Sequence, residues 1–303
     1  YGLANYILEK CGEEGKGKGV VIAYDSRYKS EEFSTEAAKT LAACGIKAYI
    51  FDSLRPTPQL SFALRHLGCV AGIVITASHN PPEYNGYKVY WTDGGQVCPH
   101  IAKEIITEVN KIEDYSKIPT TDSNNKLIVT LDETVDTAFC DAVKKQVINQ
   151  ELINKVGKDL KIIFTPIHGT GNLPIRRVLS EVGFKNVSVV KEQEMPDSNF
   201  STVAYPNPEE KEVFDIAIEM AKTDGADIII GTDPDCDRVG VVVKDNDGEY
   251  IVLNGNQVGS LLVDYVMSNK VEEIKEMHNP MIVKTIVTSE LGAEIAKSYN
   301  VGC

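Results

Sequence analysis

Short apolar runs alternate with amphipathic segments through most of the chain, and this alternation constrains the fold more than any other feature of the sequence. Val20–Tyr24 and Gly72–Ile75 are typical of buried strands, whereas Ser30–Ala43 carries apolar residues at helical spacing. Strands that alternate with helices form parallel sheets with helices on both faces. We therefore predict an α/β protein built of consecutive α/β/α domains with mixed, mostly parallel sheets.

The alternation defines a set of expected elements, separated by a polar connector at 115–126 and a proline-containing irregular stretch at 194–209. The expected strands are Val20–Tyr24, Ala48–Phe51, Gly72–Ile75, Tyr87–Trp91, Ile162–Thr165, Val187–Val190, Asp227–Gly231, Val239–Lys244 and Met281–Ile286. The expected helices are Ser30–Ala43, Pro58–Leu67, His100–Ile112, Val135–Val147, Leu173–Val182, Val213–Lys222, Gln257–Met267 and Ser289–Ser298. Ligands of such folds collect at the carboxyl ends of strands, so the loops that follow strands are the first candidates for a site.

The acidic balance of the chain excludes a general nucleic-acid binder. The formal net charge is -13, whereas nucleic-acid binding needs a basic surface. A small anionic substrate stays compatible, because a local group of cations and backbone amides can bind phosphate on an acidic protein. The longest apolar runs are far shorter than the ~20 residues of a membrane span. The seven widely spaced cysteines lack a C-x-x-C pattern and fit reduced thiols, so we expect a cytoplasmic protein without membrane or nucleic-acid partners.

Ser78 lies in the string T-A-S-H-N-P at residues 76–81, directly after a predicted buried strand. The Asn-Pro and Pro-Pro steps prevent a helix from continuing, so the serine is held on a stiff exposed loop. Phosphorylation would give it a charge of about -2 and make it a phosphoryl donor. His79 and Lys88 are close enough in sequence to line the same pocket. A lone Ser-His pair is more often a capping serine, but the full string followed by N-G-Y-K at 85–88 is rarely met by chance.

A second loop, D-P-D-C-D-R at 233–238, follows another predicted strand and places Asp233, Asp235 and Asp237 at alternate positions. On an extended segment alternate side chains point the same way, so the carboxylates converge. A hard divalent cation removes their repulsion, and Mg²⁺ suits oxygen ligands. Arg238 can clamp a phosphate with its planar guanidinium. A solvated acidic turn and a Mg²⁺-dependent phosphatase with Asp233 as the nucleophile remain as alternatives.

Three further features carry weaker signals. The string P-I-H-G-T-G-N at 166–172 opens a predicted helix, and active-site lining and plain turn chemistry are equally compatible with it. Arg27 follows the first strand. It could reach the site formed by the two strand-end loops, but we interpret it as an ordinary surface arginine. Cys236 is interpreted as packing, because a thiolate is a soft ligand.

The two loops together resemble the phosphoserine loop and the metal loop of the alpha-D-phosphohexomutase superfamily. The strings N-G-Y-K-V-Y-W, T-P-I-H-G-T-G-N and Y-P-N-P-E-E are most similar to its phosphoglucomutase/phosphopentomutase branch. The resemblance implies a phosphohexomutase-like fold that lacks the fourth domain. It divides the chain into a phosphoserine-loop domain I at 1–136 without its start, a metal-loop domain II at 137–254 and the beginning of domain III at 255–303.

The resemblance also implies a reaction. Phosphorylated Ser78 would interconvert glucose 1-phosphate and glucose 6-phosphate through glucose 1,6-bisphosphate, which is both intermediate and activator. Phosphopentomutase or phosphomannomutase activity stays open within the family. Lys88 would be a general acid/base, its pKa lowered by burial beside cationic groups. The implied sets are Ser78, Lys88 and His79 for catalysis, Arg238, Asp237 and Asn80 for substrate binding, and Ser78, Asp233, Asp235 and Asp237 for Mg²⁺.

The same resemblance places part of the family's machinery outside this sequence. A glycine-arginine loop would precede Tyr1, and loops for the sugar and the non-transferring phosphate would follow Cys303. We therefore expect this piece of 303 residues to isomerise glucose 1-phosphate poorly or not at all. The expected partner is a hexose phosphate, and the expected state is a monomer or a weak homodimer.

Overall fold

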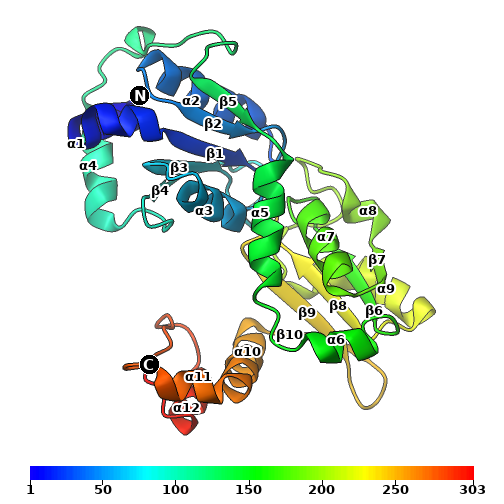
Figure 1. Cartoon of the computed structure of the whole chain (residues 1–303). Helices are drawn as coiled ribbons and strands as arrows, with labels where there is room; N and C mark the ends of the chain where they lie inside the picture. The colour runs from blue at the N-terminus through cyan, green and yellow to red at the C-terminus, as the bar shows by residue number, and fades with distance from the viewer.

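The computed structural model describes all residues from Tyr1 to Cys303 and shows two α/β domains followed by a smaller helical unit (Figure 1). The strands are β1 Val20–Tyr24, β2 Ala48–Phe51, β3 Ala71–Ile75, β4 Tyr87–Trp91, β5 Ile128–Leu131, β6 Lys161–Thr165, β7 Asn186–Val189, β8 Ile228–Thr232, β9 Val239–Lys244 and β10 Tyr250–Leu253. The helices are α1 Gly2–Lys18, α2 Ser30–Ala43, α3 Thr57–His66, α4 Pro99–Asn110, α5 Glu133–Lys144, α6 Gln150–Val156, α7 Asn172–Val182, α8 Lys191–Glu194, α9 Asp215–Asp224, α10 Gly255–Asn269, α11 Val271–Glu276 and α12 Leu291–Ser298, with short 3-10 turns η1 Tyr115–Lys117 and η2 Lys211–Phe214.

The first domain is a sheet in the order β4-β3-β1-β2-β5, in which only β4 runs antiparallel to its neighbour. Its central strand β1 is buried along its whole length. Val20, Ile22 and Tyr24 pack into the core beneath α1, α2 and α4. Val21 and Ala23 pack on the opposite face beneath α3 and α5. This arrangement follows from the period of two in a strand, because an apolar run buries both faces of the sheet.

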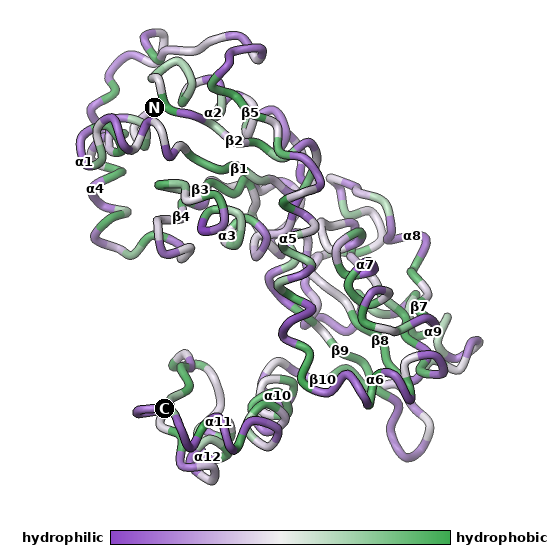
Figure 2. Tube along the Cα trace, in the orientation of Figure 1, coloured by the Kyte–Doolittle hydropathy of each residue, from purple (hydrophilic) through white to green (hydrophobic).

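The second domain repeats the plan with the order β10-β9-β8-β6-β7. Strands β6, β7 and β8 are parallel, whereas β9 is antiparallel to both β8 and β10. Ile163 of β6 and Ile229 of β8 pack with Phe214 and Ala217 around α9. The predicted α/β class with mixed sheets is therefore confirmed. In Figure 2 the apolar segments follow the strands of both domains, and the hydrophilic segments lie in the outer loops.

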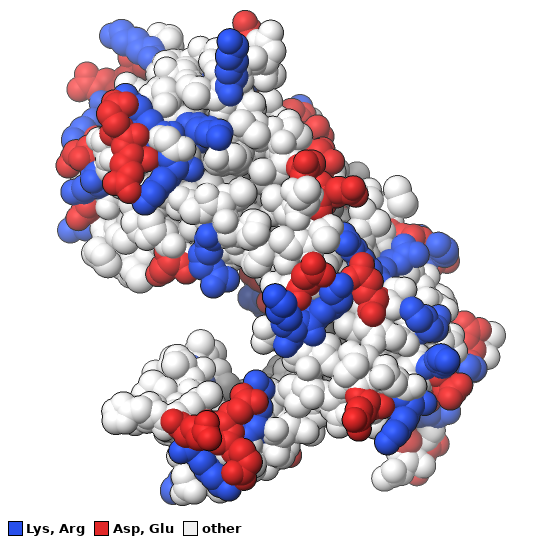
Figure 3. Space-filling model, in the orientation of Figure 1, with Lys and Arg blue, Asp and Glu red and all other residues white.

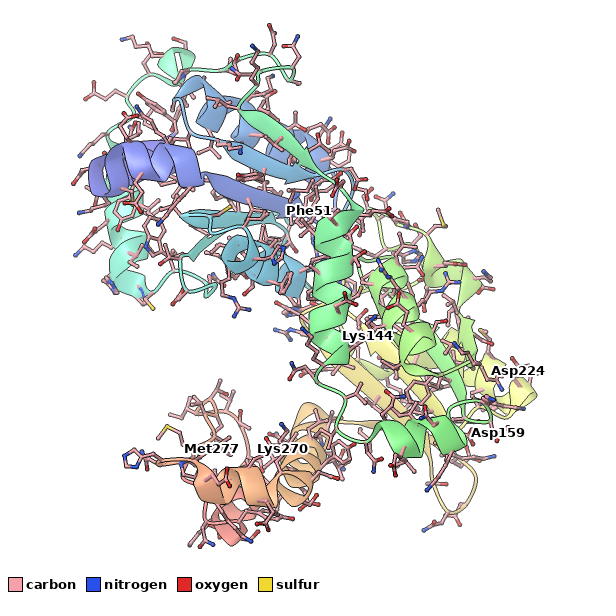
Figure 4. The ribbon with its side chains drawn as sticks, viewed as in Figure 1. Phe51, Lys144, Asp159, Asp224, Lys270 and Met277 are labelled. Carbon is pink, nitrogen blue, oxygen red and sulfur yellow. The ribbon has the colours of Figure 1, made fainter.

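The carboxyl ends of the parallel strands in both domains point toward the junction between them. Figure 4 shows Phe51, at the end of β2, near this junction, and shows Asp159 and Asp224, which precede β6 and β8, at the far end of the second domain. Helix α5 runs along the junction and packs against both α3 and α7. The boundary expected between residues 136 and 137 thus falls inside one helix.

The C-terminal unit has a small core formed by Met267, Ala296 and Val301. The strand predicted at Met281–Ile286 is wrong, because the segment forms only a single bridge from Met281 to Gly302. Val283 and Ile286 are 90% and 99% exposed. A strand needs a neighbouring backbone to satisfy its hydrogen-bonding groups, and no second strand lies beside this segment. Figure 3 shows an uncharged surface over this part of the unit.

The other predicted elements are present, with ends that differ by three residues or fewer. Helix α1 was not predicted; Gly12, Gly15 and Gly17 lower its helix propensity. Strands β5 and β10 were also missed; they are four-residue strands at sheet edges, with little pattern to detect. Helix α1 is interrupted by a kink at Gly12, where the backbone is not helical. None of the helices combines the length and the apolar character that a bilayer crossing requires.

Candidate active site

The serine loop and the acidic loop meet at the domain junction, although they are 155 residues apart in the chain. Ser78 Oγ donates a hydrogen bond to Asp233 Oδ2 at 2.6 Å. The expectation of an exposed serine is wrong, because Ser78 is buried. It lies in the left-handed region, with φ of 52°, a conformation that costs free energy for a residue other than glycine. Its backbone N–H donates to Thr76 Oγ1 at 2.8 Å, which helps to hold the turn. The loop thereby directs the serine hydroxyl toward the second domain.

Asp233, Asp235 and Asp237 converge as predicted, but the expected cause, an extended segment with alternate side chains on one side, is wrong. Residues 233–238 form a turn rather than an extended segment, and Cys236 has φ of 55°. One carboxylate oxygen from each aspartate lies within 4.8 Å of the others. Asp233 Oδ1 accepts hydrogen bonds from the backbone N–H groups of Asp237 at 3.1 Å and Arg238 at 3.0 Å. The loop therefore folds around its own first carboxylate.

The donor set fits a hard divalent cation. Asp233 and Asp235 are both 0% exposed, and Asp235 Oδ1 is buried without a hydrogen-bond partner. Such an oxygen is costly to bury unless a partner or a cation reaches it. Three carboxylates and a serine hydroxyl form the all-oxygen environment that Mg²⁺ favours. We conclude that Ser78, Asp233, Asp235 and Asp237 have the chemistry to hold such an ion.

The electrostatics of the triad are those of crowded carboxyl groups. Burial, and then repulsion from Asp235, raises the pKa of Asp233 to about 8. Burial, and again Asp235, raises the pKa of Asp237. Burial opposes ionisation of Asp235 as well, but Lys88 and the Thr57 hydroxyl hold its pKa below the ordinary value. Burial and mutual repulsion therefore favour the protonated form of Asp233 when no cation is bound, and a bound cation would favour the ionised form.

Lys88 projects from β4 into the acidic loop. Its Nζ lies 3.0 Å from Asp235 Oδ2 and 3.9 Å from Asp237 Oδ2. The expectation that Lys88 lies beside cationic groups is wrong, because its ion-pair partners are carboxylates. Its place next to the loop does agree with a role at the same site.

His79 and Asn80 follow Ser78 but point to different partners. His79 Nδ1 lies 3.3 Å from Ser78 Oγ, and burial, with a contribution from the Arg238 charge, lowers the pKa of the imidazole. The ring is thus neutral near pH 7 and able to accept or donate a hydrogen bond. Asn80 is exposed, and its amide donates to the carbonyl of Ala77 at 2.8 Å. Arg238, the last residue of the acidic loop, is exposed.

The interpretation of Arg27 as an ordinary surface arginine is wrong. It is 3% exposed and forms an ion pair with Asp25, from Nε to Oδ2 at 3.3 Å. Its guanidinium donates to backbone carbonyls of the serine loop. A signal was present in the sequence: the D-S-R string follows a fully apolar strand, at the edge of the sheet where sites of this class form.

Thr57, at the start of α3, was not recognised from the sequence. Its Oγ1 donates to Asp235 Oδ2 at 3.0 Å, and its N–H donates to the Asp235 carbonyl at 2.9 Å. These bonds connect the first domain to the acidic loop of the second. Thr170, from the P-I-H-G-T-G-N string, supports the same loop, because its N–H and Oγ1 both donate to the Pro234 carbonyl. The Thr170 amide is therefore not available to an anion.

Comparisons with protein-family models match two of them to this chain. Residues 1–116 match phosphoglucomutase/phosphomannomutase alpha/beta/alpha domain I, and residues 137–248 match alpha/beta/alpha domain II of the same family.

Curated relatives and solved structures agree with this match. The chain is 38% identical to a phosphoglucomutase of Staphylococcus haemolyticus over 301 residues, which is 99% of the chain and 53% of the relative. It is 36% identical to a phosphoglucomutase of Staphylococcus aureus over 303 residues, covering 99% of the chain and 52% of the relative. A phosphoglucomutase/phosphomannomutase family protein from Burkholderia thailandensis shares the fold, with a TM-score of 0.74 at 21% identity over 99% of this chain and 59% of that one. The chain thus spans about half the length of the curated relatives it matches.

Proposed function

Because the chain belongs to the phosphoglucomutase/phosphomannomutase family, we propose that it supplies the phosphoserine and metal loops of an enzyme that interconverts glucose 1-phosphate and glucose 6-phosphate. The single observation that carries the proposal is the Ser78 Oγ–Asp233 Oδ2 contact of 2.6 Å. It joins a hydroxyl that can carry phosphate to an acidic site that can carry a cation. The choice of glucose rests on the relatives named phosphoglucomutase.

In this proposal the chain divides as the sequence suggested, with domain I at 1–136, domain II at 137–254 and the beginning of a third domain at 255–303. Ser78, Asp233, Asp235 and Asp237 would hold Mg²⁺. When bound, the ion neutralises charge on the phosphoryl group during transfer. Glucose 1,6-bisphosphate is the expected intermediate and activator.

The chemical step exchanges one phosphate ester for another. The bond from phosphorus to Ser78 Oγ breaks, a bond from phosphorus to a sugar hydroxyl oxygen forms, and the proton of that hydroxyl moves to a base. We assign this proton transfer to Lys88, which would accept the proton as the neutral amine; its Nζ lies 3.0 Å from Asp235 and so borders the acidic loop. The reverse step on the other phosphate of the bisphosphate returns the proton and rephosphorylates Ser78. His79 is half-buried, Asn80, Asp237 and Arg238 are exposed on the two loops, and all four are proposed to orient the sugar phosphate.

The geometry favours Ser78 over Asp233 as the phosphoryl carrier. Asp233 Oδ1 already accepts two backbone N–H groups, and Oδ2 accepts the Ser78 hydroxyl. A carboxylate with both oxygens engaged is poorly placed to attack phosphorus. The phosphatase hypothesis, which needs Asp233 as nucleophile, therefore explains the contacts less well.

The test is phosphate uptake from glucose 1,6-bisphosphate in the presence of Mg²⁺, followed by intact mass and peptide mapping. We expect one phosphate on Ser78 of the wild type, none on Ser78→Ala, and normal uptake by Ser116→Ala, which changes an exposed serine of the connector. Phosphate found on Asp233, or equal uptake by Ser78→Ala, would contradict the proposal.

A further inference from the structure

The Arg27 guanidinium joins four carbonyls of the serine loop. Nη2 donates to the carbonyl of Ser78 at 2.6 Å and to that of Asn80. Nη1 donates to the carbonyls of Pro81 at 2.7 Å and Tyr84 at 3.0 Å. A planar guanidinium presents several donors in fixed directions, which a lysine ammonium does not. The loop is therefore held along its backbone, from the serine to the start of the return strand.

The second domain forms part of the Arg27 environment. The guanidinium carbon lies 5.0 Å from the ring centroid of Phe200, within the range of a cation–π contact. Phe200 is fully buried and has φ of 48°. On the side of the first domain, Asp25 pairs with Arg27 Nε and accepts the hydroxyl of Thr76 at 2.6 Å. Arg27 is thus enclosed between Asp25 in its own domain and an aromatic ring from the other.

The Phe200 loop is in turn held by His168, a residue of the P-I-H-G-T-G-N string. His168 Nδ1 lies 2.9 Å from the Met195 carbonyl, and its Nε2 lies 2.9 Å from Thr202 Oγ1. The imidazole thereby bridges the two ends of the segment that carries Phe200. His168 is buried, with φ of 59°, so the chain adopts an unfavourable backbone conformation to place this ring.

We propose that Arg27 is a positioning residue that holds the Ser78 loop in its transfer geometry, and that Phe200 of the second domain holds Arg27 in place. The serine is then fully ordered only when the second domain, with its acidic loop, is docked. Ordering of the serine loop, which places the phosphoryl carrier, therefore depends on the domain that contributes the metal site. The statement about phosphoryl transfer rests on the proposed function, whereas the statement about loop order does not.

The experiment compares Arg27→Lys with Arg65→Lys, the same change at an exposed arginine of the first domain. Hydrogen exchange is measured at the amides of Ser78, Asn80 and Tyr84, which are hydrogen-bonded within the loop. We expect Arg27→Lys to exchange these amides about tenfold faster, with β1 and β3 unchanged. Its maximal rate of Ser78 phosphorylation, normalised to the folded fraction, should fall about tenfold at unchanged Mg²⁺ affinity. Arg65→Lys should change neither.

A second variant, Phe200→Leu, keeps Arg27 and removes only the aromatic ring, so it tests the contact between domains even if Arg27→Lys does not fold. We expect faster exchange at Ser78, Asn80 and Tyr84 in this variant also. Unchanged loop exchange in a folded Arg27→Lys, exchange raised equally across the whole first domain, or a Phe200→Leu effect confined to the second domain would each overturn the inference. A wild type that takes up no phosphate would refute the proposed function, and the exchange data would still decide the role of Arg27.

Discussion

The serine loop and the acidic loop face each other across the domain junction, but they are held in different ways. The serine loop is held from outside, through its backbone carbonyls, by the side chain of Arg27. The acidic loop also accepts backbone hydrogen bonds from Thr57 and Thr170, but in addition it is held by one of its own carboxylates, because Asp233 Oδ1 accepts the amides of Asp237 and Arg238. Each loop also places one residue other than glycine, Ser78 or Cys236, in the left-handed region.

The difference corresponds to what each loop is proposed to undergo. A serine that gains and loses a phosphate changes its charge by about -2, so hydrogen bonds through its side chain would be remade at every turnover. Backbone carbonyls are unaffected by that change, and all the hydrogen bonds from the Arg27 guanidinium to the serine loop go to such carbonyls. The aspartates keep their covalent structure, so their own carboxylates can hold their loop permanently. Four predictions test this comparison.

The largest effect is expected for Asp235→Asn, which removes one negative charge from the acidic loop and leaves the other contacts nearly isosteric. Mg²⁺ affinity should fall about 100-fold, because charge count sets the affinity of an all-oxygen site. Isothermal titration with Mg²⁺ measures this, with Asp247→Asn in the exposed β9–β10 turn as the matched control. Equal affinities of the two variants would show that the triad is not the metal site.

Lys88→Met should have the next largest effect, on stability. It leaves the buried Asp235 carboxylate without its cation, which costs about 2 kcal/mol for a partly exposed pair. Added Mg²⁺ should recover most of this free energy of unfolding, because it supplies positive charge at the same carboxylates. Urea unfolding with and without Mg²⁺ gives both values, and Lys126→Met provides the exposed control. If Lys88→Met loses the same free energy of unfolding with and without Mg²⁺, the ion and the Lys88 ammonium do not act on the same carboxylates.

Thr57→Val tests the link from the first domain to the acidic loop. It removes the hydroxyl that donates to Asp235 Oδ2 but keeps the backbone bond and the shape of the side chain. The free energy of unfolding should fall by about 1 kcal/mol, and Mg²⁺ affinity should fall a few-fold. Thr107→Val, on the exposed side of α4, should leave Mg²⁺ affinity unchanged. If both variants bind Mg²⁺ like the wild type, Thr57 does not orient the loop.

The smallest effect is expected for Cys236→Gly. Glycine removes the strain of a positive φ, and the loss of side-chain packing offsets the gain, so stability should change by less than about 1 kcal/mol. Cys236→Val at the same position should cost about 2 kcal/mol, because a β-branched residue disfavours this region. Thermal unfolding of the two variants tests whether the backbone conformation at Cys236 contributes more to stability than the packing of its thiol.

Sequence patterns located the elements that depend on local chemistry. The apolar runs at β1, β3 and β8 and the proline-rich step after Ser78 were sufficient to place two strand-end loops, since burial and turn propensity are properties of a few neighbouring residues. Helix α1 escaped detection because its glycines weaken the local signal. Met281–Ile286 was predicted as a strand because its residues suit one, and local composition does not state whether a partner strand is present.

The sequence by itself therefore determined the class of fold, the loop that carries Ser78 and the loop that carries the three aspartates. Only the tertiary structure decided which atoms meet: Ser78 with Asp233, Lys88 and Thr57 with Asp235, and Arg27 with the serine loop and Phe200. The physical reason is that these contacts join residues from different strands and different domains. Their geometry depends on sheet order and on domain docking, which no short stretch of residues encodes.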